Sequence, residues 1–179
     1  LIGMGAAAAA PVIASCSRSD SAAPDSAMQG AIRPLPLSDP RVEEFLAYRV
    51  QTRVDPATAI TEYTAPGFTY TSSAGEKFDA AGLANRINDW RQGFTLVEGT
   101  PLWAASLPDG QLMLATRDTV KHPGQFRGQQ ATNKTFDTES LFTINYNNHG
   151  KLPRYTRYTD RRATPAGIWT ADGASPHPL

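Results

Sequence analysis

The spacing of apolar residues changes once along this chain, at Gly93, and that change limits the folds open to it. Before Gly93 the apolar residues recur every three or four positions, as they do on one face of a helix. After it they alternate with polar residues, as in strands that turn one face to a core. Helices followed by consecutive strands favour an α+β fold, with the N-terminal helices packed on one face of a curved antiparallel sheet.

Capping residues and helical spacing predict three helices. The first begins at Pro40 after a cap by Ser38 or Asp39, because such side chains accept hydrogen bonds from first-turn N–H groups and proline fits that turn. The second covers residues 56–63, and the third covers residues 80–92. The apolar face of the first helix is expected to hold Val42, Phe45, Leu46 and Val50.

Five segments have the pattern of strands, one before the third helix and four after Gly93, with turn residues between most of them. They are residues 68–72, 95–107, 111–121, 136–146 and 151–161. On the third of these, alternation places Asp118 on a face that is otherwise mostly apolar. On the last, Tyr155 and Arg157 share a face. These side chains are the first candidates for a functional site.

The N-terminus has the features of a targeting signal and not of a folded domain. Residues 1–15 are uncharged and too short to span a bilayer, which needs about 20 residues, but they suit the apolar part of a signal peptide. The run Ile13-Ala14-Ser15-Cys16 resembles the lipobox of bacterial lipoproteins. That resemblance implies acylation of Cys16 and a place in a bacterial cell envelope, facing the periplasm or the exterior. The alternative is an alanine-rich helix with an incidental cysteine.

The predicted organisation is an export signal (residues 1–15), a flexible tether (16–37), a folded domain (38–163) and a tail (164–179). The 17 basic and 17 acidic residues balance, so a nucleic-acid partner is not expected. The three histidines are scattered without the spacing of metal ligands, so we predict no metal and no cofactor.

Three stretches of the domain together resemble the SnoaL-like branch of the nuclear transport factor 2-like superfamily. They are Pro66-Gly67-Phe68-Thr69-Tyr70, residues 122–128 (HPGQFRG) and residues 150–160 (GKLPRYTRYTD). The resemblance implies a cone whose sheet wraps an apolar pocket for a small molecule, with the helices on the concave face. It also implies a homodimer through the outer sheet face.

The chemistry that the resemblance implies does not carry over directly. SnoaL-like cyclases use an aspartate on the last strand as general base, and the matching position here holds Arg157, which cannot accept a proton. The positions of the family's histidines hold Tyr155 and Ser140. Asp118 and Tyr155 are therefore the candidate catalytic residues, and Tyr70, Ser140 and Arg157 are candidate ligand contacts.

Each candidate has a structural alternative. Arg157 either clamps a ligand carboxylate or phosphate, or forms a bridge across strands to Asp118 or Glu139. Tyr155 is either a pocket hydroxyl or a core ring. His122 is either a ligand contact at the mouth of the cone or a surface turn residue. Trp90 and Trp103 are expected in the core.

Three functions follow from these features: a lipid-anchored module that binds a small, partly apolar ligand, an acid–base enzyme with a non-standard base, or an envelope module that binds another protein. A pocket lined by the candidate residues favours the first two, and a filled cone with a broad apolar outer face favours the third. An ion pair between Arg157 and Asp118 argues against the enzyme, because it occupies the replacement base.

Overall fold

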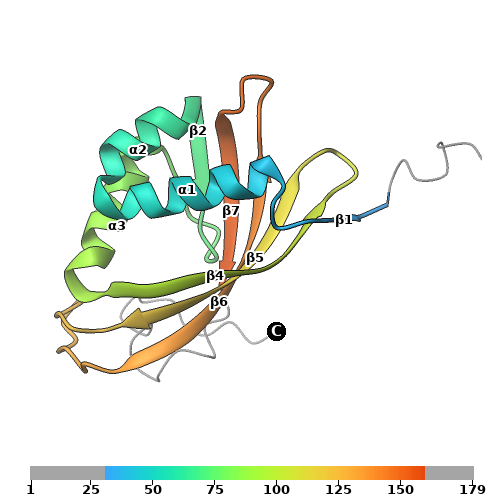
Figure 1. Ribbon diagram of the computed structural model, residues 1–179. Coiled ribbons are helices and arrows are strands. Elements are labelled where there is room, and N and C mark those ends of the chain that lie inside the picture. Colours follow the sequence, from blue (N-terminus) through green and yellow to red (C-terminus); the bar gives the residue numbers. More distant parts are fainter. Residues whose placement is uncertain (1–30, 160–179) are drawn as a thin grey trace, which may run out of the picture.

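Three aspartates fix where the helices begin. The computed structural model describes residues 31–159, in which three helices cover one face of a curved sheet (Figure 1). The helices are α1 (Pro40–Val54), α2 (Pro56–Tyr63) and α3 (Ala80–Gly93). Asp39, Asp55 and Asp79 precede them, and each side chain accepts a hydrogen bond from a backbone N–H of the first turn. The predicted helices are confirmed, and Asp39 is the first cap.

The sheet has seven strands in the order β1-β4-β5-β6-β7-β2-β3. They are β1 (Arg33–Leu35), β2 (Thr64–Thr71), β3 (Lys77–Phe78), β4 (Thr95–Ser106), β5 (Leu112–Lys121), β6 (Thr135–Asn145) and β7 (Leu152–Thr159). The α+β prediction is confirmed, but the sheet is not wholly antiparallel, because β2 pairs with β7 in parallel. Parallel strands need a long connection, and five elements separate β2 from β7 in the chain.

The tether prediction was wrong in its last part. Residues 33–35, placed in the tether, form β1 and pair with β4, with Arg33 opposite Ser106 and Leu35 opposite Ala104. The fold therefore begins before residue 38. The predicted signal, Cys16, the rest of the tether and the tail lie outside the described residues. Within residues 31–159, no helix has the length and apolar character needed to cross a bilayer.

The core confirms the predicted faces of the long strands. On β5, Leu112, Leu114, Thr116, Asp118 and Val120 are all buried. From α1, Phe45 contacts the rings of Phe142 on β6 and Tyr155 on β7, with centroids 5.2 and 5.4 Å away. Val50 was expected on this face but is 62% exposed, because it follows the buried Tyr48 by two positions and so lies on the other side of the helix.

A second, smaller core joins the end of α3 to the loop between β5 and β6. It contains Phe94, Val120 and Phe126. Gly93 lies against this loop, and a Cβ there would come within 2.4 Å of the Phe126 Cβ. Glycine at the helix end therefore permits a close approach that positions the wall of the cone. Trp103, expected in the core, is 46% exposed on β4.

Strand β4 is irregular along its length. Its pairing with β5 shifts between Leu96 and Glu98 and again between Pro101 and Trp103. Such bulges bend a strand and increase its twist, which suits a sheet that curves around a cavity.

We expect Phe45→Ala to destabilise the domain by about 3–5 kcal/mol, because it removes a fully buried ring at the junction of α1, β6 and β7. The measurement is the free energy of unfolding from urea titration. Val50→Ala on the same helix is the control and should change that free energy by less than about 0.5 kcal/mol. Equal effects of the two substitutions would contradict this view of α1.

Candidate functional site

A cavity of about 160 Å³ lies on the concave side of the sheet, with walls from α1, α3, β2 and the strands β4 to β7. Its size is close to the ~150 Å³ of an apolar protein cavity that holds one benzene molecule. Much of its wall is apolar, formed by Leu83, Ile87, Trp90, Leu96, Val120 and Phe136. The cavity can therefore enclose a molecule with a body about the size of one aromatic ring.

A buried ion pair lies in the wall of this cavity. Arg49 on α1 donates from Nη2 to Asp118 Oδ2 at 2.6 Å and from Nη1 to Thr116 Oγ1 at 3.1 Å. The guanidinium also lies over the ring of Phe142, 4.8 Å from its centroid. The side chains of Arg49 and Asp118 are only 12% and 4% exposed, so the pair is shielded from water. Burial lowers the pKa of Arg49, and the neighbouring Asp118 opposes this shift.

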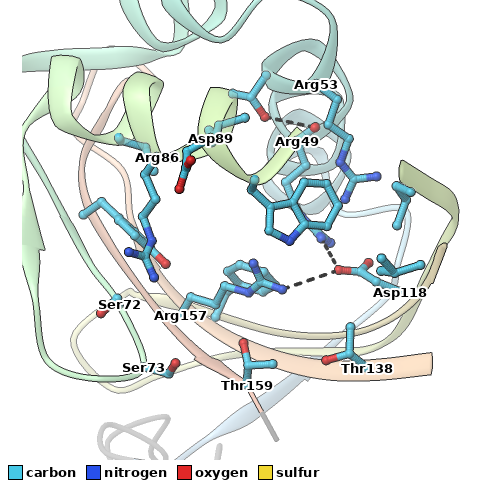
Figure 2. Close-up of a pocket in the computed structure, with 18 of the residues that line it drawn as sticks. Arg49, Arg53, Ser72, Ser73, Arg86, Asp89, Asp118, Thr138, Arg157 and Thr159 are labelled. Atoms are coloured by element: carbon cyan, nitrogen blue, oxygen red, sulfur yellow. Dashed lines mark hydrogen bonds and ion pairs between the residues drawn. The ribbon is translucent and has the colours of Figure 1, made fainter. Parts of the chain in front are cut away.

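Arg157 approaches the same carboxylate from β7 (Figure 2). Its Nη2 lies 3.8 Å from Asp118 Oδ2, and its Nε and Nη2 each donate to Ser140 Oγ at 3.1 Å. The predicted bridge between Arg157 and Asp118 is therefore present, although it is longer than the pair that Arg49 makes. Glu139, the other expected partner, pairs with Arg117.

Two buried polar atoms of the cavity wall have no hydrogen-bond partner among the described residues. They are Asp118 Oδ1 and Thr138 Oγ1. A buried polar group without a partner costs about 1–3 kcal/mol, so such atoms are uncommon in folded proteins. Their position in one cavity indicates that this space suits a polar occupant as well as an apolar one.

Tyr155 is both a core ring and part of the cavity wall. Its ring lies 4.9 Å from that of Tyr70 and 5.9 Å from that of Tyr48, measured between centroids. Burial, and then the nearby Tyr48 and Tyr70, raise the pKa of Tyr155 well above its usual range. Tyr155 therefore keeps its proton at neutral pH, and its hydroxyl can donate a hydrogen bond but cannot act as a base there.

No protein-family model matches the sequence, and no curated protein matches it either. Solved structures do resemble it. A protein described as a SnoaL-like polyketide cyclase from Jannaschia sp. CCS1 has a TM-score of 0.57 and 16% identity, over 77% of this chain and 97% of the other. A protein described as a polyketide cyclase from Acidithiobacillus ferrooxidans has a TM-score of 0.57 and 17% identity, over 72% and 94%.

The domain has the nuclear transport factor 2-like fold. AclR from Streptomyces galilaeus, described as a hydroxylase, also resembles it, with a TM-score of 0.53 and 12% identity over 77% of this chain and 84% of the other. Proteins described by different activities thus share this fold, so the likeness establishes architecture and the residues of the site must indicate the chemistry.

Within the nuclear transport factor 2-like cone, four predicted residues line the cavity: Tyr70, Asp118, Tyr155 and Arg157. Ser140 lies behind them as a hydrogen-bond acceptor for Arg157. Trp90 lines the cavity and also stacks on Phe94, so its expected place in the core is only part of its role.

His122 contradicts both of its predicted roles, because it lies neither at the mouth of the cone nor on the surface. It is fully buried, its ring stacks on Phe94 at 4.6 Å, and its Nδ1 lies 3.3 Å from Thr132 Oγ1. It follows the buried Val120 by two positions, and its backbone N–H bonds to the carbonyl of Lys134. The strand alternation therefore continues one residue past β5 and turns this ring inward.

Two arginines of the cavity wall were not identified from the sequence, Arg49 and Arg53. They follow Phe45 by four and eight positions on α1 and so lie near its buried face. Their helical spacing from Phe45 could have identified them from the sequence. Among residues 31–159 there is no group of three or more histidine, cysteine, aspartate or glutamate side chains that could hold a metal ion.

We expect Asp118→Asn to destabilise the domain by about 3–5 kcal/mol, because it leaves the buried Arg49 without its counter-ion. Urea unfolding measures the change. The control is Glu139→Gln on the neighbouring strand, which removes a carboxylate from the exposed pair with Arg117 and should have no measurable effect. If Asp118→Asn is as stable as the parent protein, the pair does not hold α1 to the sheet.

Proposed function

We propose that this domain binds a small, partly apolar molecule in the cavity of its cone. The observation that carries the proposal is the combination of an apolar wall with two buried polar atoms that have no partner among the described residues. An apolar cavity with a few polar groups aimed into it is the usual form of a small-molecule site. The solved structures described as polyketide cyclases add support, since such proteins act on small organic molecules.

The surroundings of both candidate catalytic residues weigh against the acid–base enzyme. Asp118 uses one carboxylate oxygen to accept from Arg49 and to face Arg157, so its charge is already engaged. Tyr155, the other candidate, keeps its proton at neutral pH. The domain therefore offers hydrogen bonds and charge to a ligand more readily than it offers a base.

The outer face of the sheet is mixed and does not favour the protein-binding module over the ligand site. It carries the Arg117–Glu139 ion pair. It also carries an apolar row of Trp103, Ala115, Leu141 and Tyr158, which lie opposite one another on four adjacent strands. This row would support the homodimer expected through the outer face, which stays a prediction.

Ligand binding is tested with p-cresol, a neutral molecule with a single ring, by titration followed by the NMR shift of the Trp90 indole N–H. Ile87→Trp fills the cavity wall and should weaken binding at least about tenfold, since a bulky side chain occupies the ligand's space. Val97→Trp is the matched control, because Val97 is 61% exposed and outside the cavity wall. Equal weakening by both substitutions, or a failure to bind both p-cresol and charged molecules with the same single ring, would refute the proposal.

We also propose that the domain is held at a bacterial membrane through Cys16 and the tether that follows it. The support is the Ile13-Ala14-Ser15-Cys16 sequence and the short uncharged run before it. Two or more acyl chains give stable anchoring where a single chain does not.

In the native cell we expect Cys16→Ser to abolish incorporation of labelled palmitate and to move the protein from the membrane fraction to the soluble fraction. Ser17→Ala, next to it in the chain, is the control and should change neither. Labelling that persists in Cys16→Ser would mean that Cys16 does not carry the lipid.

A further inference from the structure

Three arginines meet around Asp118. Arg49 and Arg53 lie one turn apart on α1, Arg157 reaches in from β7, and all three line the cavity. Figure 2 shows the three side chains on the side of the cavity where Asp118 lies. The sequence predicted only Arg157 here, so the helix adds two cations to the same space.

The charges at this end of the cavity do not balance. Arg49 and Asp118 form a close pair at 2.6 Å and neutralise one another. Arg53 and Arg157 then remain as an excess of two positive charges. The other arginines of the wall differ, because Arg86 lies 3.5 Å from Glu76 and Arg127 lies 3.5 Å from Asp89.

Arg53 is the cation with the fewest contacts in this group. Among residues 31–159 its side chain makes no hydrogen bond within 3.5 Å and no ion pair within 4.0 Å. Burial, and then the adjacent Arg49, lower the pKa of Arg53 to about 10, so it is still charged at neutral pH. Asp118 opposes this shift, but it lies beyond ion-pair distance. A partly buried cation without a close counter-ion is costly, and an anion in the cavity would relieve that cost.

A buried hydroxyl without a hydrogen-bond partner also lies at this end of the cavity. Thr138 lies directly opposite Asp118 on the neighbouring strand, and its buried Oγ1 has no partner in the described part of the chain. A hydroxyl can donate to an oxyanion, and guanidinium groups bind oxyanions with charge-assisted hydrogen bonds.

We propose that the ligand carries a doubly negative head group, of which a phosphate monoester is the simplest example, attached to an apolar body about the size of one ring. Arg53 and Arg157 bind the head group, and the apolar wall around Trp90 contacts the body. A doubly charged group matches both excess charges, whereas a single carboxylate or sulfonate matches one. This inference rests on the proposed ligand-binding function and names its ligand class.

The test compares three probes that share one ring: phenyl phosphate, benzenesulfonate and p-cresol. At about pH 7.5 phenyl phosphate is doubly charged, because the second pKa of a phosphate monoester is about 6, and it should bind at least about tenfold more tightly than benzenesulfonate. Its affinity should rise between about pH 5 and pH 7.5 as that proton leaves, while the affinity of benzenesulfonate stays constant. The Trp90 indole N–H again reports binding by NMR.

Arg53→Met should reduce the affinity ratio of phenyl phosphate to benzenesulfonate to near one, and Arg53→Lys should keep most of it, because the charge remains. Since Arg53 has no ion pair in the described residues, both variants should fold, and thermal unfolding verifies this. Arg117→Met is the control, because Arg117 lies exposed outside the cavity and its loss should leave the ratio unchanged.

The outcomes separate the two proposals. If p-cresol binds but the two anions bind equally, or if Arg53→Met leaves their ratio intact, the inference of a doubly negative ligand is overturned and the proposed function stands. If none of the three probes binds, both proposals fail.

Discussion

The buried ion pair between Arg49 and Asp118 is the contact on which the site depends. It joins the last turns of α1 to the middle of β5, so it sets how closely the helix lies against the concave sheet. Buried pairs seldom add much to stability relative to an apolar core, but breaking one leaves a charge stranded in a region of low dielectric constant. The pair thus fixes the position of α1 relative to β5, and the cavity lies beside this contact.

The same pair also determines the character of the cavity. Because one carboxylate is balanced by Arg49, every further arginine in that part of the wall adds uncompensated charge. The resemblance to SnoaL-like proteins matched a family aspartate on the last strand to Arg157, whose charge has the opposite sign. That part of the wall therefore carries a guanidinium, which cannot accept a proton, where the resemblance implied a carboxylate.

The sequence was enough to predict the order of the three helices and of five of the seven strands, the buried face of β5 and the shared face of Tyr155 and Arg157, because these follow from local periodicity. It was not enough to predict partners that are distant in the chain. Arg49 and Asp118 are 69 positions apart, so no local pattern links them. The parallel pairing of β2 with β7 and the strand formed by residues 33–35 were missed for the same reason, since pairing depends on what lies alongside.

The irregularity of β4 bears on the behaviour of the protein at high concentration. Beyond the three positions paired with β1, this strand has only β5 as a partner within residues 31–159, so in that part of the chain the rest of its edge is unpaired. An open edge invites other chains to add strands and build fibrous aggregates. Pro101 lacks an N–H to offer, and the two bulges interrupt the regular row of backbone groups that an incoming strand would need. The distortions that curve the sheet thereby also protect crowded copies of the molecule from joining edge to edge.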